Sequence, residues 1–209
     1  IILMSISYKK NNNNNLFKNI EEFSEIYNNQ NYIPIYKLFF NITENNYNQF
    51  NLNNIKNIIT LEKKINYSKF FATIKNNNND ENFENKKVFL KYSPILDPTK
   101  FLLGKIDISN IENLLPIYSN DLSINSLKIN NPLNTSYCDG FFSYLSSILL
   151  NNYNFINGID YYGSFIGLKK NFQYDVSEDI EFLSESDFFK ENLNILFNFL
   201  NNDFDKKLI

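Results

Sequence analysis

Apolar positions along the chain fall into short runs that are separated by tracts of polar residues, mostly asparagine. The run from Ile33 to Phe40 is β-branched and aromatic, which is typical of a strand. Between Asn53 and Ile65 the aliphatic residues recur near helical spacing, so a helix is predicted there. The sequence also predicts a strand from Tyr67 to Ile74, a polar loop from Asn76 to Asp80, and a short strand from Lys87 to Tyr92.

Two short helices carry clear start signals in the sequence. Asp97 is a good N-cap and proline suits the first helical position, so a helix is predicted from Pro98 to Leu103, ended by Gly104. Ser186 is expected to cap a last helix from Asp187 to Phe199, in which the acidic first residue lies favourably near the positive end of the helix dipole.

The longest predicted helix runs from Asn134 to Leu150, with Thr135 or Ser136 as its cap. Its apolar face, which should be buried, is formed by Phe141, Tyr144, Leu145, Ile148 and Leu149. We expect this face to pack against a strand from Ile159 to Phe165, and a further strand is predicted from Phe172 to Asp175. Strands and helices that are segregated in this way indicate an α+β fold with an antiparallel sheet and a long packed helix.

The first part of the chain, residues 1–31, is predicted to be an Asn-rich, weakly ordered leader. Asn11 to Asn15 form a homopolymer that offers little apolar surface to offset the entropy of ordering. An amphipathic helix from Leu16 to Tyr27 is compatible with the spacing of its apolar residues. Residues 32–209 are then expected to form the ordered domain.

Composition excludes several classes of function. The net charge is -3 and all 20 basic residues are lysine, so no basic field or arginine is present to bind nucleic acid. Because histidine is absent, the chain contains neither a Ser-His-Asp triad nor a His-ligated zinc site. The one cysteine, Cys138, cannot form an internal disulfide, and without a histidine partner it is expected to be a small buried residue.

The sequence predicts a protein that is neither secreted nor embedded in a membrane. No run of 18 or more apolar residues is present, and the short apolar start is followed at once by Lys9 and Lys10. Because the chain begins with Ile1 and not with methionine, we expect it to be part of a longer reading frame. The single cysteine fits a reducing compartment, or a protein that does not need disulfides for its stability.

A few side chains are candidates for chemistry. Lys91 ends an apolar strand pattern, where a lysine can hold the phosphates of a nucleotide or can simply face solvent. Asp139 and Asp160 are the nearest acidic partners that the sequence offers for its ammonium group. The later carboxylates Asp175, Glu178, Asp179 and Glu181 do not have the spacing of a calcium loop and are expected to form a solvated acidic face.

Three segments together resemble the N-terminal half of protein-kinase-like proteins of giant nucleocytoplasmic DNA viruses. The segments are Val88 to Pro98, Asn134 to Leu145, and Phe155 to Gly167. The similarity extends from about Tyr32 to Phe197. It implies a fold like the small lobe of a protein kinase, in which the helix from Asn134 is the regulatory helix. Val88 to Lys91 would then be an inner strand beside residues 161–165, and Lys91 would point toward the cleft between lobes and contact ATP.

The resemblance implies a Ser/Thr protein kinase that uses ATP and Mg²⁺ on a protein substrate, in the host cytoplasm (viral factory) or the virion. The catalytic loop and the metal-binding aspartate would follow this chain, so the fragment alone is expected to be inactive and to contain neither catalytic nor metal-binding residues. A glycine-rich loop is missing before Lys91, and the helix has no glutamate to pair with it. The alternative is therefore a non-catalytic, pseudokinase-like interaction protein or virion structural protein.

Overall fold

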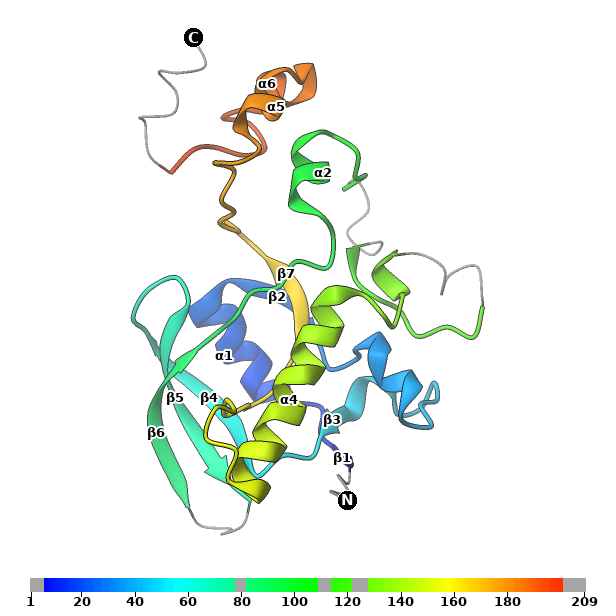
Figure 1. Ribbon diagram of the computed structural model, residues 1–209, viewed down its shortest axis with the longest axis vertical. Coiled ribbons are helices and arrows are strands. Elements are labelled where there is room, and N and C mark those ends of the chain that lie inside the picture. Colours follow the sequence, from blue (N-terminus) through cyan, green and yellow to red (C-terminus); the bar gives the residue numbers. More distant parts are fainter. Residues whose placement is uncertain (1–5, 78–81, 109–113, 122–127, 201–209) are drawn as a thin grey trace. The chain divides into compact units, whose positions relative to one another are not determined.

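The structure, a computed structural model, describes residues 6–77, 82–108, 114–121 and 128–200 (Figure 1). The chain divides into two compact units. The first unit comprises Ile1–Ile95 and Leu114–Lys170, and the second comprises Leu96–Asn113 and Asn171–Ile209. The expected boundary between a leader of residues 1–31 and a domain of residues 32–209 does not coincide with this division.

In the described part of the first unit, three small antiparallel sheets combine with two helices, which agrees with the predicted α+β class. The strands are β1 (Tyr8–Lys10), β2 (Ile26–Gln30), β3 (Phe50–Leu52), β4 (Lys56–Lys64), β5 (Lys69–Asn76), β6 (Phe83–Phe89) and β7 (Ile166–Lys169). In the sheets, β1 pairs with β3, β2 pairs with β7, and β5 pairs with both β4 and β6. The helices are α1 (Asn14–Ser24) and α4 (Thr135–Tyr153), and short 3₁₀ turns lie at Pro34–Leu38, Tyr47–Gln49 and Lys128–Asn130.

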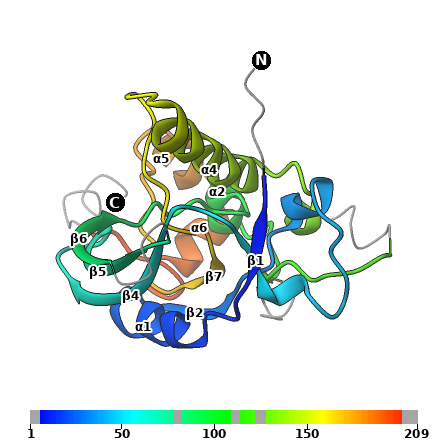
Figure 2. The same ribbon diagram turned by 90° about the horizontal axis from the view of Figure 1, so that it is seen from below.

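Helix α1 packs on the three-stranded sheet, and both views show it lying against β4 (Figures 1 and 2). Leu16 and Ile20 lie one helical turn apart and are both buried, so they present one apolar stripe to the sheet. They join a core that includes Leu61 of β4 and Phe70 of β5, each with at most 1% of its surface exposed. The expected helix near Leu16 is therefore confirmed.

The prediction of a weakly ordered, poorly packed leader is wrong for residues 6–31. This segment supplies β1, α1 and β2. Strand β1 pairs with β3, strand β2 pairs with β7, and helix α1 packs on β4, so all three belong to the first unit. The Asn homopolymer was given more weight than the apolar residues of the helix that follows it, although these are numerous enough to bury a helix face. Asparagine side chains also form hydrogen bonds that hold the tract in place.

Helix α4 buries the predicted face in a second core. Phe141, Tyr144 and Ile148 are buried, and Leu145 packs at the edge of the same cluster. The face packs against the 3₁₀ turn at Pro34–Leu38 and against Tyr161, not against Tyr162 and Phe165, which belong to the other core. The cap is also different from the predicted one, since the Asn134 side chain accepts the hydrogen bond from the Ser136 N–H.

Four predicted elements differ from the structure. Residues 33–40, predicted as a strand, contain a 3₁₀ turn, because Pro34 has no N–H to donate within a sheet. Residues 53–65, predicted as a helix, contain strand β4, because its β-branched residues pair with β5. Residues 161–165 run extended beside β4, where the Ile58 N–H donates to the Tyr162 carbonyl, but form no strand. No strand forms at residues 172–175 either.

The described residues of the second unit include three short helices, α2 (Pro98–Leu102), α5 (Ile180–Ser184) and α6 (Asp187–Asn192). The predicted caps are confirmed, because Asp97 accepts from the N–H groups of Thr99 and Lys100, and Ser186 accepts from that of Phe189. Gly104 follows α2 with a φ of 69°, a conformation that glycine adopts without strain. Helix α6 ends earlier than predicted, and Asn194 shortly beyond it has a φ of 67°.

Candidate functional site

The segment that carries Lys91 lies between two other parts of the first unit. On one side, the Leu90 N–H donates to the Ser68 carbonyl, and the Tyr92 hydroxyl donates to the Tyr67 carbonyl, both in the β4–β5 connection. On the other side, the Ser136 hydroxyl at the start of α4 donates to the Pro94 carbonyl at 2.7 Å. These bonds fix the backbone on both sides of Lys91.

Lys91 forms an ion pair with Asp139, one of its two candidate partners. The Lys91 Nζ lies 2.8 Å from Oδ1 and 2.7 Å from Oδ2 of Asp139, which belongs to helix α4. The side chains are 63% and 40% exposed, so water screens the pair. The expected partner is thus present, but on the surface.

The strand environment predicted for Lys91 is wrong. We expected Val88 to Lys91 to form an inner strand beside residues 161–165. Strand β6 instead ends at Phe89 and is an edge strand, and residues 161–165 lie beside β4 at the opposite edge. Periodicity identified the strand but contains no information about the order of strands in a sheet.

Asp160, the other candidate partner, pairs with Lys56. The Lys56 Nζ donates to its Oδ2 at 2.6 Å, and the Asn151 amide donates to its Oδ1 at 3.0 Å. Partial burial raises the pKa of the Asp160 carboxyl, but the hydrogen bonds from Lys56 and Asn151 and the positive charge of Lys56 outweigh it. The net effect is a pKa below the usual value, so Asp160 is a charged structural tie between α4 and β4 and not a proton donor.

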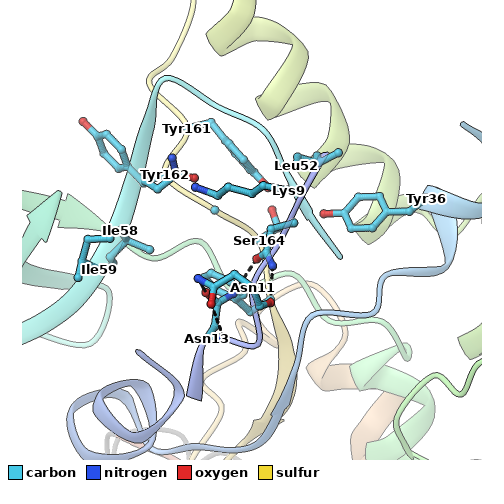
Figure 3. A pocket seen from close by; sticks show the side chains of 14 residues that line it. Lys9, Asn11, Asn13, Tyr36, Leu52, Ile58, Ile59, Tyr161, Tyr162 and Ser164 are labelled. Carbon is cyan, nitrogen blue, oxygen red and sulfur yellow. Dashed lines mark hydrogen bonds between the residues drawn. The ribbon is translucent and has the colours of Figure 1, made fainter. Parts of the chain in front are cut away.

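A small cavity of about 40 Å³ lies where β1, β3, β4 and residues 161–165 meet (Figure 3). Its lining includes Lys9, Asn11, Asn13, Tyr161 and Ser164, and among the described residues that line it, Lys9 alone is charged. Burial, and next the charge of Lys75, lower the pKa of the Lys9 ammonium. Sequence reasoning missed this cavity because Lys9 precedes an Asn tract that was expected to be unpacked.

Asparagine side chains hold the tract in place beside this cavity. The Asn13 side-chain amide donates to the side-chain Oδ1 atoms of Asn31 and Asn51, at 2.6 Å in both cases. The Asn31 amide, which is buried, donates to the backbone carbonyls of Asn11 and Asn12 at 3.3 Å and to that of Asn48 at 2.7 Å. The polar tract is therefore an ordered network, and only the three-dimensional pairing of distant asparagines could have revealed it.

A larger, more open cavity of about 420 Å³ lies near the end of α4. It is lined by neutral side chains, namely Ser7, Asn53, Asn54, Ile55, Asn77, Tyr144, Ile148 and Asn152. Several of these groups already bond to each other, as in the hydrogen bond from the Tyr144 hydroxyl to the Asn53 carbonyl. Neither cavity is lined by Lys91 or Asp139.

The remaining candidates have structural surroundings. Cys138 is a free thiol, partly buried at the edge of the α4 core. The carboxylates Asp175, Glu178 and Glu181 are exposed as expected, and Asp179 accepts a hydrogen bond from the Thr99 hydroxyl at 3.0 Å. Among the described residues, no group of three or more His, Cys, Asp or Glu side chains could hold a metal ion.

In the part of the chain that the structure describes, no helix has both the length and the apolar character needed to cross a membrane. Comparisons with protein-family models, with curated proteins and with solved structures found no match for this chain. The resemblance to viral protein-kinase-like proteins therefore stays a prediction that rests on the sequence segments named above.

Proposed function

We propose that this chain is the N-terminal region of a Ser/Thr protein-kinase-like protein of a giant nucleocytoplasmic DNA virus. In this proposal, Lys91 contacts the phosphates of ATP, Asp139 orients its ammonium group, and the Mg²⁺-binding and catalytic residues belong to a C-terminal lobe that follows. The full-length protein would act on a protein substrate in the host cytoplasm, at the viral factory, or in the virion.

The observation that supports this proposal is the ion pair between Lys91 and Asp139. A lysine that follows a strand, held by a carboxylate of a helix in the same lobe, is the arrangement that positions a nucleotide-contacting lysine in protein kinases. The chain order also agrees, because an antiparallel three-stranded sheet comes first, then Lys91, then the long helix α4. Asp139 replaces the usual glutamate with a shorter side chain.

A non-catalytic interaction protein is the second candidate, and the exposure of the same pair favours it. A lysine that holds phosphates usually works in a cleft, where water is excluded and electrostatic attraction is strong. The Lys91 side chain is 63% exposed and lines neither of the two cavities described above. A scaffold built on a kinase-like fold would keep the pair only for its contribution to structure.

ATP binding to the full-length protein distinguishes the two candidates. Isothermal titration with ATP and Mg²⁺ would compare the wild type with Lys91→Met and Asp139→Asn. Lys87→Met is the matched control, because Lys87 is an exposed lysine of the same strand region that forms a contact with the Phe71 ring. A kinase-like site predicts at least tenfold weaker binding for Lys91→Met, an intermediate loss for Asp139→Asn, and unchanged binding for Lys87→Met.

Two results would count against Lys91 as a nucleotide contact. Equal ATP affinity in the wild type and Lys91→Met would remove Lys91 from the site while leaving nucleotide binding elsewhere. The absence of ATP binding in the wild type would support the non-catalytic interaction protein.

A further inference from the structure

The cavity beside Lys9 has the charge of an anion site. Its lining contains one ammonium group and no carboxylate, and Figure 3 shows the Lys9 side chain lying among Tyr161, Tyr162 and Ser164. Among the described residues, no hydrogen bond or ion pair joins the Lys9 ammonium to another side chain. A half-buried ammonium without a counter-ion is costly, and an anion in the cavity would remove that cost.

A second positive charge lies close enough to act on Lys9. The charge of Lys75, in strand β5, contributes to the lowered pKa of the Lys9 ammonium after the effect of burial. Two neighbouring ammonium groups repel each other and together attract a negative charge. With the Lys9 ammonium and no carboxylate among the described lining residues, the cavity favours an anion over a cation.

Three consecutive residues of the lining also offer backbone N–H donors. Gly163, Ser164 and Phe165 are consecutive residues of the lining, and among the described residues their backbone N–H groups have no hydrogen-bond acceptor. Gly163 has a φ of 148°, and a Cβ atom there would lie 2.9 Å from the Phe165 ring. These three residues line the same cavity as the Lys9 ammonium, and an acceptor-rich oxyanion could accept hydrogen bonds from their N–H groups.

The size of the cavity restricts the ligand. A water molecule needs about 10–15 Å³ of such space, so 40 Å³ holds about three water-sized groups. That volume fits a small oxyanion but leaves no room for a nucleoside or a peptide. We propose that the cavity beside Lys9 binds a small inorganic oxyanion, of the size of bicarbonate or phosphate, between the Lys9 ammonium and the backbone N–H groups of residues 163–165.

The test is a titration of this chain with sodium phosphate and with sodium bicarbonate, at constant ionic strength set by chloride. Binding would be followed by ¹⁵N amide chemical shifts. The expected result is saturable binding of at least one oxyanion, with selective shifts of the amides of Gly163, Ser164 and Phe165. Lys9→Met keeps the aliphatic stem and removes the charge, and it is expected to weaken binding at least tenfold.

Lys10→Met is the matched control, since Lys10 is the exposed neighbour in the same strand and does not line the cavity. It should bind as the wild type does. Equal binding by Lys9→Met and the wild type would overturn the proposal, as would equal losses in both lysine variants. If Lys9→Met does not fold, the amide chemical shifts of the wild-type chain provide the test by themselves. Saturable shifts that do not include residues 163–165 would also overturn the proposal.

Discussion

Replacing Asn31 tests whether the Asn-rich N-terminal segment is an integral part of the first unit. Only 1% of the Asn31 surface is exposed, and its side-chain amide connects the backbone at Asn11 and Asn12 to that at Asn48. The same side chain accepts the hydrogen bond from Asn13, directly before α1. Asn31→Ala removes these bonds and leaves the backbone almost unchanged.

The expected loss in the free energy of unfolding depends on which hydrogen-bond partners Asn31→Ala leaves without a bond. The two short bonds, at 2.6 Å from Asn13 and at 2.7 Å to the Asn48 carbonyl, contribute roughly 1 kcal/mol each to the free energy of unfolding. The Asn13 amide still donates to Asn51, and Asn48 is an exposed residue whose carbonyl can bond to water instead. We therefore expect Asn31→Ala to lower the free energy of unfolding by about 2 kcal/mol.

Equilibrium urea denaturation, followed by far-ultraviolet circular dichroism, measures this loss. With a urea slope of about 2 kcal/mol per molar, the midpoint should fall by roughly 1 M. Asn31→Asp has nearly the same shape but loses the donor and brings a carboxylate to three carbonyl oxygens, so it should destabilise at neutral pH at least as much. Asn45→Ala, at an exposed asparagine, is the control and should change the free energy by less than about 0.5 kcal/mol. Equal midpoints for Asn31→Ala and Asn45→Ala would refute the role of the network.

Three further predictions concern the first unit. Phe141 is buried, so Phe141→Ala should lower the free energy of unfolding by about 3–5 kcal/mol in the same urea assay. Phe142, whose side chain is 73% exposed, is the control, and Phe142→Ala should change this free energy by less than about 0.5 kcal/mol. Because the pKa of Asp160 is lowered, its stabilising effect should be present above the unfolded-state pKa of about 3.9 and lost as the pH falls through the folded-state pKa. The stability difference between wild type and Asp160→Asn should therefore shrink in acid, and a constant difference down to pH 2 would contradict this. Lys91→Ala should change the free energy of unfolding by less than about 1 kcal/mol, because the ion pair between Lys91 and Asp139 is exposed. A larger loss would show that this ion pair has a structural role.

The sequence predicted elements whose signals are local. Helix α4 has a continuous apolar face, and α2 begins with an aspartate cap and a proline, so both could be located to within a few residues. The pairing of Lys91 with Asp139 was also among the predicted alternatives. These features depend on residues that are close in sequence, or on the small number of acidic partners available to one lysine.

Features that depend on distant pairing could not be predicted in the same way. Strand β4 has a spacing of aliphatic residues that suits a helix, and its pairing with β5 decides the outcome. The position of residues 161–165 beside β4, and not beside β6, follows from contacts that no periodicity encodes. The Asn31 network and the cavity at Lys9 depend on the same long-range contacts, so composition alone suggested disorder where the structure has order.

The central functional proposal, that Lys91 contacts the phosphates of ATP, can be tested by chemical labelling of the full-length protein. An acyl-phosphate derivative of ATP transfers its acyl group to a lysine amine that lies beside the bound phosphates, and ATP leaves. Mass spectrometry then identifies which of the lysines carry the acyl group. The account predicts selective labelling of Lys91 that is blocked by excess ATP and reduced in Asp139→Asn. Labelling of Lys91 at the same level as the exposed Lys87, and unaffected by ATP, would contradict it.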